Sequence, residues 1–100
     1  MLDQLTRATF EPLLGKRFVA LMTEGQTVEM ELIEARALPV HPGSKGPRRE
    51  PFSLVFRGPR KFVLPQCIYH MEQAALGTVE IFLVPIGPDE SGQRYEAIFN

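Results

Sequence analysis

A strict apolar–polar alternation, Val-Glu-Met-Glu-Leu at residues 28–32, is the sequence feature that most limits how this chain folds. Successive side chains of a β-strand point to opposite faces, so the alternation predicts a strand with one buried and one exposed face. A helix is the alternative, because Glu, Met and Leu favour helices, but the strict alternation favours the strand. A second alternating run precedes it, and Gly25 lies between the two. Residues 16–38 are therefore predicted to form a β-hairpin.

Four further segments have the pattern of strands, and turn residues separate them. Residues 78–87 are apolar on both faces, which predicts a strand that is covered on both sides at its far end. Pro85 is predicted to lie at an edge or a bulge, since it cannot donate a ladder hydrogen bond. The predicted fold is all-β: a mostly antiparallel sandwich or small barrel of six to seven strands. The four segments are 52–58, 67–73, 78–87 and 94–100.

The N-terminal segment, residues 1–15, is predicted to be helical. Thr6 is a suitable N-cap, and Gly15 suits the left-handed position that follows a helix. Pro12 is expected to tighten or bend the segment, because it removes one backbone donor. Three apolar residues fall on one side at helical spacing: Phe10, Leu13 and Leu14.

The chain of 100 residues fits one domain, residues 1–100, with the β body at 16–100. Residues 39–51 hold four prolines and two glycines, which predicts a long loop without regular structure. A net charge of −1 provides no overall field toward nucleic acid or anionic lipid, and nucleic acid is not the expected partner.

Neither a signal peptide nor a membrane span is visible. Asp3 and Arg7 interrupt the N-terminal apolar residues, and the longest apolar run, at 79–87, is too short to cross a bilayer. No membrane association is expected. We expect a cytoplasmic protein, or a part of an extracellular or phage-like assembly that lacks a signal peptide.

Cys67, His70 and Glu72 are three potential metal ligands or acid–base groups within six positions. On a strand, His70 and Glu72 share one face while Cys67 lies on the other, and His41 is distant in the long loop. A zinc site needs three or four converging ligands, and a thiol enzyme needs its imidazole beside the thiol. The cluster is therefore interpreted as an ordinary strand, with Cys67 a packed apolar residue. We predict no catalytic residue, no metal and no cofactor.

Basic residues are concentrated in one part of the chain. Six of the eleven lie between positions 45 and 61, where Glu50 is the only acid. If the long loop and the turn at 57–61 lie at one end of the β body, they form a basic rim that meets phosphate or an acidic protein. Solvated loops with scattered arginines are the alternative. The predicted rim consists of Lys45, Arg48, Arg49, Arg57, Arg60 and Lys61.

Four motifs are distinctive: Phe-Arg-Gly-Pro at 56–59, Leu-Pro-Gln at 64–66, ALGTVEIFLVPIGP at 75–88 and RYEAIFN at 94–100. With these motifs the chain resembles, over nearly its whole length, a family of small bacterial proteins catalogued as a domain of unknown function. In that family the position of Cys67 is commonly glycine or another small residue, which argues against a catalytic thiol. The resemblance also implies a gene setting beside phage-tail-collar-like fibre proteins. It provides no catalytic residue.

The function expected from these observations is non-enzymatic. We expect a small interaction or assembly module whose partner is a protein, such as a tail-collar-like fibre protein. Contact would use an exposed strand edge, which would also support a homo-oligomer, or it would use the basic loops. The alternative is a small-ligand or sugar-phosphate binding barrel with the basic rim at its mouth. An enzyme is the third class considered.

Overall fold

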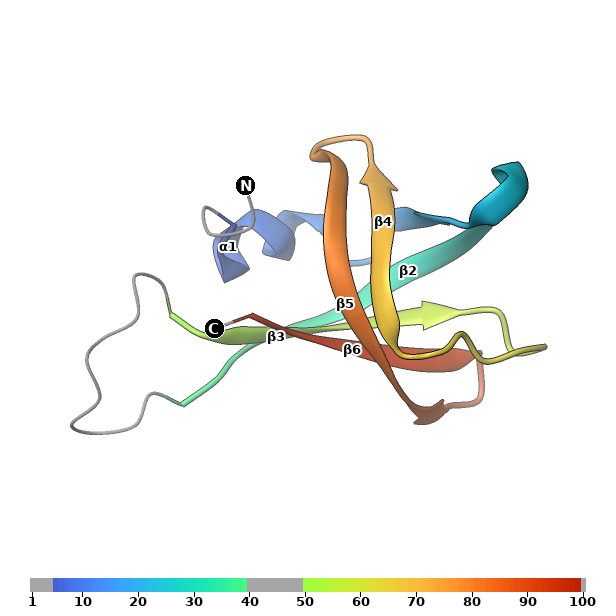
Figure 1. Cartoon of the computed structure of the whole chain (residues 1–100). Coiled ribbons are helices and arrows are strands. Elements are labelled where there is room, and N and C mark those ends of the chain that lie inside the picture. The colour runs from blue at the N-terminus through green and yellow to red at the C-terminus, as the bar shows by residue number, and fades with distance from the viewer. Residues whose placement is uncertain (1–4, 40–49, 100) are drawn as a thin grey trace.

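Six strands and a short helical segment make up the part of the chain that the computed structural model describes, residues 5–39 and 50–99 (Figure 1). No helix in this part has the length and apolar character needed to span a bilayer. The elements are α1 (Arg7–Phe10), the 3-10 turn η2 (Glu11–Leu13), β1 (Arg17–Leu21), the 3-10 turn η3 (Thr23–Gly25), β2 (Thr27–Ala37), β3 (Phe52–Gly58), β4 (Cys67–Gln73), β5 (Gly77–Pro88) and β6 (Gln93–Phe99).

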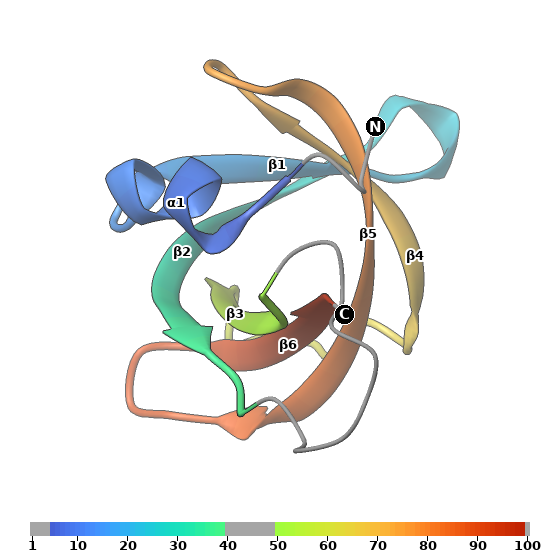
Figure 2. The same cartoon turned by 90° about the vertical axis from the view of Figure 1, so that its left-hand side faces the viewer.

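The strands form a closed antiparallel barrel in the order β1-β2-β3-β6-β5-β4. Figure 2 shows them curving around a common centre. The predicted hairpin is confirmed, because β1 pairs with β2 through a turn at Thr23–Gly25. The all-β fold is confirmed as well, and of the two predicted architectures the barrel is the one that forms.

Two bulges let long strands bend within this barrel. The register between β2 and β3 shifts between Leu32 and Glu34, and the register between β5 and β6 shifts between Pro85 and Gly87. A bulge inserts an extra residue and bends its strand. Pro85 was predicted to lie at an edge or a bulge, and it lies at a bulge. The bend also lets β5 pair with β4 along its first part and with β6 along its second.

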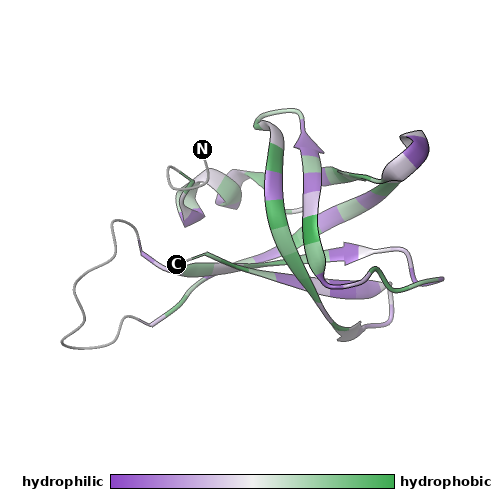
Figure 3. Ribbon diagram, viewed as in Figure 1, coloured by the Kyte–Doolittle hydropathy of each residue, from purple (hydrophilic) through white to green (hydrophobic). Residues whose placement is uncertain are grey.

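The barrel interior is filled by side chains that alternate along each strand. Figure 3 shows the corresponding bands of high and low hydropathy along β4 and β5. Each strand contributes buried residues to this interior, and Tyr95 is fully enclosed. Side chains of this kind fill the interior of a small barrel. The core consists of Phe10, Leu13, Phe18, Ala20, Met30, Leu32, Phe52, Leu54, Phe56, Leu64, Tyr69, Met71, Ile81, Leu83, Tyr95, Ala97 and Phe99.

The N-terminal helical segment closes one end of the barrel. Thr6 has an extended backbone before α1, and its N–H donates to Thr9 Oγ1 at 3.1 Å. Pro12 lies in the 3-10 turn η2, so the segment tightens where the proline predicts it. Phe10 is fully buried and inserts its ring among core aromatics. Leu14 was predicted to share that face, but it is 43% exposed, because the 3-10 turn changes the direction of the last residue.

Two expectations concern the strand surfaces. Among the described residues, β5 pairs with β4 over 77–83 and with β6 over 84–88, so each part of this strand has a ladder partner on one side. The contact or homo-oligomer through strand edges therefore stays a prediction. Phe82, expected beneath a cover on the second face of β5, is instead 47% exposed.

Candidate functional site

The potential ligands on β4 do not converge. Tyr69 and Met71 point into the core, while His70 and Glu72 are exposed on the opposite face. Across the ranges 5–39 and 50–99, no three His, Cys, Asp or Glu side chains lie close enough together to hold a metal ion. His41 lies outside the described residues. The prediction that this segment is a strand, with His70 and Glu72 on its outer face, is confirmed.

Cys67 departs from its predicted environment. We expected a packed apolar residue, but the thiol is exposed, because Cys67 is the first residue of β4 and lies at the rim of the barrel. The nearby Tyr69 hydroxyl donates to the Pro65 carbonyl at 2.5 Å. Burial, followed by the hydrogen bond with Cys67, raises the pKa of Tyr69 above its ordinary value. The phenol therefore stays protonated and anchors the entry to β4.

Arg57, a residue of the predicted basic rim, is held by a carboxylate. Its Nε and Nη2 donate to the Asp89 carboxylate at distances of 2.6–3.2 Å, and Glu31 lies 3.9 Å away. Asp89 also accepts backbone N–H bonds from Ser91 and Gly92. The Arg57 hydrogen bond, with the Ser91 N–H, lowers the pKa of Asp89 to about 2, and the same hydrogen bond raises the pKa of Arg57. This guanidinium is thus neutralised within the chain.

Arg60 has a structural role next to this pair. Its Nη1 donates to the backbone carbonyls of Asp89 and Glu90 at 3.0 and 3.1 Å. The Gln93 amide donates back to the Arg60 carbonyl at 3.3 Å. These bonds join the β3–β4 connection to the β5–β6 loop. Lys61, the next residue, is exposed.

The described residues of the predicted rim, Arg57, Arg60 and Lys61, lie at the same end of β3. Leu38 and Pro51, which flank the long loop, share a backbone hydrogen bond of 2.9 Å beside the first residue of β3. Arg57 and Arg60 lie at the other end, about 20 Å away along a seven-residue strand. The predicted rim residues Lys45, Arg48 and Arg49 lie outside the described residues.

An apolar pair occupies the outer face of the barrel, where polar residues are expected. Ile68 on β4 and Phe82 on β5 are opposite each other in the ladder, and they are 58% and 47% exposed. Val84 follows on the same face of β5 and is half-buried. We call the outward side chains of β4 and β5 around this pair, which include His70, Glu72 and Glu80, the β4–β5 face. The apolar residues on both sides of 78–87 are the sequence signal for it.

The charges of the β4–β5 face have one sign. Neither strand contains Lys or Arg, and Glu72 and Glu80 supply its carboxylates. His70 Nδ1 lies 4.0 Å from the Glu80 carboxylate, and both side chains are more than half exposed. The face therefore combines an apolar centre with an acidic border.

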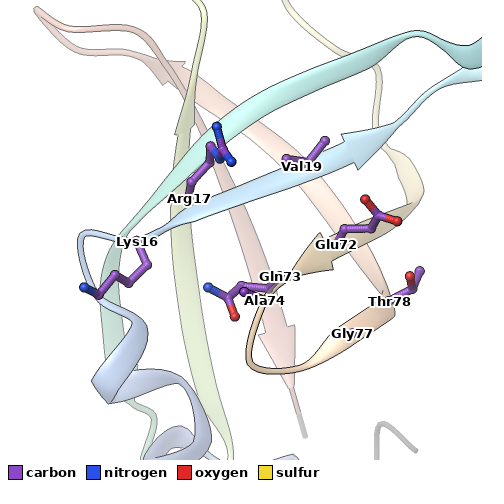
Figure 4. Close-up of a pocket in the computed structure, with 8 residues that line it drawn as sticks. All are labelled: Lys16, Arg17, Val19, Glu72, Gln73, Ala74, Gly77 and Thr78. Carbon is purple, nitrogen blue, oxygen red and sulfur yellow. The ribbon is translucent and has the colours of Figure 1, made fainter.

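A groove of about 490 Å³ lies where β1 and the β4–β5 hairpin diverge. The ladder between β1 and β4 runs from Leu21 to Val19, which is opposite Glu72, and the hairpin turn follows. Figure 4 shows Lys16 and Glu72 on opposite sides of this groove. A second groove of about 470 Å³ holds the partly exposed ion pairs of β1, β2 and β3. The first groove is lined by Lys16, Arg17, Val19, Glu72, Gln73, Ala74, Gly77 and Thr78.

Comparison with known proteins identifies a family without a described activity. The model of a domain of unknown function, DUF6916, matches residues 5–99. No curated protein matches the chain. No solved structure matches it either. Since the match covers nearly the whole sequence, the chain belongs to the DUF6916 family.

Proposed function

We propose that this protein is a non-enzymatic interaction module, and that the β4–β5 face is its contact surface. The observation that carries the proposal is the outward pair of Ile68 and Phe82, both about half exposed and directly opposite in the ladder. Apolar patches on the outside of a barrel indicate a surface that is covered in the working protein.

The energetics of the pair favour burial against another surface. Complete burial of an exposed Ile or Phe side chain contributes about 1.5–3 kcal/mol, so covering the exposed half of each of these two contributes about half of that. Aromatic side chains at the centre of an interface often dominate its affinity. Phe82 is held by a continuous ladder to β4, so it is presented without the entropic cost of ordering a loop.

The charges narrow the class of partner. Glu72 and Glu80 border the apolar pair, and neither strand offers a competing Lys or Arg. A complementary partner presents apolar side chains flanked by basic residues. The family resemblance implies tail-collar-like fibre proteins, from a bacterial gene setting, as the first class of partner to test.

The ligand-binding alternative receives less support. The barrel centre is occupied by buried aromatic and aliphatic side chains, and Arg57 and Arg60 are engaged by the β5–β6 loop. A small ligand would have to use a surface groove such as the one beside Lys16 and Glu72.

Binding measurements with face variants test the proposal. The purified chain is titrated with a tail-collar-like fibre protein encoded beside its gene, using calorimetry. The double variant Ile68→Thr/Phe82→Thr places threonine, a good strand former, at both positions and is expected to weaken binding at least tenfold. The matched control Leu14→Thr removes a similarly exposed apolar side chain from the helical segment and is expected to bind like the wild type.

Equal affinity of the double variant and the wild type would overturn the β4–β5 face as the contact surface. A wild-type chain that binds no such fibre protein would overturn that class of partner. A thermal stabilisation by a small molecule that Lys16→Ala removes would favour the groove and the ligand-binding alternative.

A further inference from the structure

A second apolar surface lies in the β3–β4 connection. Phe62 and Val63 are 43% and 54% exposed, and the exposed Lys61 precedes them. We call residues 61–63 the basic-apolar segment. Figure 1 shows the connection that contains it extending outward beyond the first residues of β4.

The basic-apolar segment is held at both ends. Before it, Arg60 donates to the carbonyls of Asp89 and Glu90. After it, Leu64 is buried and its N–H donates to the Tyr95 hydroxyl at 2.8 Å. Two fixed ends limit the conformations of the three residues between them, so less entropy is lost when they bind.

We infer that the β4–β5 face binds the basic-apolar segment of a second copy of this chain. In this contact Phe62 and Val63 of one copy cover Ile68 and Phe82 of the next. The inference deepens the proposed function and rests on it, because it names a partner for the same face.

Charge complementarity supports this occupant. Lys61 carries the positive charge that the acidic border of the β4–β5 face lacks. Glu80 is accessible to it, because this carboxylate is more than half exposed and its neighbour His70 is 4.0 Å away. Pairing of opposite charges around an apolar centre fixes the orientation of such a contact.

The segment does not cover the face of its own copy. Val63 and Ile68 are five positions apart in the chain, yet both remain more than half exposed. Both surfaces are thus available to another molecule. Since the contact joins two different surfaces, two variants that each lack one of them should complement each other.

Sedimentation velocity with two variants tests the inference. Phe62→Thr/Val63→Thr removes the apolar part of the segment, and Ile68→Thr/Phe82→Thr removes the apolar part of the face. The wild type is expected to self-associate with increasing concentration, while each variant alone is at least tenfold weaker. An equimolar mixture of the two variants is expected to form a heterodimer.

Two controls exclude misfolding as the cause of weaker self-association. Complementation requires that both variants are folded, so it cannot arise from misfolding. Leu14→Thr is the control that should self-associate like the wild type.

A charge exchange provides a second measurement. Lys61→Glu should weaken self-association, and mixing it with Glu80→Lys should restore the contact between them. A wild type that stays monomeric up to millimolar concentrations, or variants that do not complement, would overturn the inference. The proposed function would survive that result if Ile68→Thr/Phe82→Thr bound the fibre protein more weakly than the wild type. The proposed function would fail on its own if this variant bound the fibre protein as tightly as the wild type.

Discussion

Arg57 and Asp89 form a forked ion pair that joins the end of β3 to the loop before β6. The shortest of its three hydrogen bonds, from Nη2 to Oδ2, is 2.6 Å, and both side chains are about a quarter exposed. Asp89 also orders its own loop by accepting the N–H groups of Ser91 and Gly92. An arginine that sequence reasoning assigned to an external partner therefore has an internal one.

The pH dependence of stability should report this pair. The folded chain lowers the pKa of Asp89 from 3.8 to about 2, so folding favours the carboxylate form. The stabilisation is fully present above the unfolded pKa and is lost as the pH falls through the folded pKa. We expect the stability difference between the wild type and Asp89→Asn to be constant near neutral pH and to shrink between pH 3.8 and about 2. Urea unfolding at a series of pH values measures it. A difference that is unchanged at the lowest pH would contradict the assigned pKa.

Tyr95→Phe should destabilise the barrel, because it removes the hydroxyl that accepts a hydrogen bond from a buried backbone N–H. The Tyr95 oxygen is the partner of the buried Leu64 N–H, and phenylalanine leaves this donor unpaired. The expected cost is about 1–3 kcal/mol in the free energy of unfolding. Tyr69→Phe is the matched control: it leaves no buried N–H unpaired, and it removes a donor to the part-buried Pro65 carbonyl and the hydrogen bond with the exposed Cys67, at a cost of about 0.5–1.5 kcal/mol. Chemical unfolding measures the free energy of unfolding of both variants. A larger decrease in Tyr69→Phe than in Tyr95→Phe would contradict the prediction.

Gly92→Ala should be poorly tolerated, for steric reasons. A Cβ atom at position 92 would lie 2.1 Å from the Gly58 carbonyl oxygen, so the β5–β6 loop would have to move away from β3. Overpacking of this kind costs about 1–3 kcal/mol. The control is Gly58→Ala, whose Cβ would meet Met30 and Tyr95 at an ordinary distance of 3.5 Å. The two thermal unfolding midpoints should differ clearly, and equal midpoints would show that the close approach is absent.

Phe10→Ala should show how strongly the helical segment is attached. The Phe10 ring centroid lies 5.9 Å from that of Phe52 and 5.7 Å from that of Phe99, and the side chain is fully buried. We expect the free energy of unfolding to decrease by about 3–5 kcal/mol, as it does when other buried aromatic side chains are truncated to alanine. Leu14→Ala, four positions later, should change stability by less than about 0.5 kcal/mol, because this side chain is exposed. Similar losses in the two variants would contradict the placement of the segment.

Most of the fold could be predicted because the pattern is local. Alternation at 28–32 and the turn around Gly25 were enough to predict the first hairpin, and Pro85 predicted a bulge. The choice between sandwich and barrel depends on how β5 bends from β4 to β6, which no local pattern encodes. The exposure of Leu14 depends on the 3-10 turn that Pro12 introduces, and the helical spacing of the apolar residues does not predict the geometry of that turn.

The candidate site was less predictable, because it depends on which groups meet in space. Arg57 and Asp89 are 32 positions apart, so the sequence showed two charges and not a pair. The apolar residues on both faces of 78–87 were recognised, but they were interpreted as a covered strand. Ser53 is a further example: it is fully buried on the outer side of β3, between Arg36 and Ile98, and its hydroxyl has no hydrogen-bond partner within the described residues.

Amide chemical shifts test the β4–β5 face as a contact surface most directly. ¹⁵N-labelled wild type is titrated with unlabelled wild type, and the perturbed amides are mapped onto the barrel. Contact between the face and the basic-apolar segment predicts that signals from 67–72, 78–84 and 61–63 move together and saturate together. Perturbations confined to other strands, or spectra that do not change at any concentration, would contradict it.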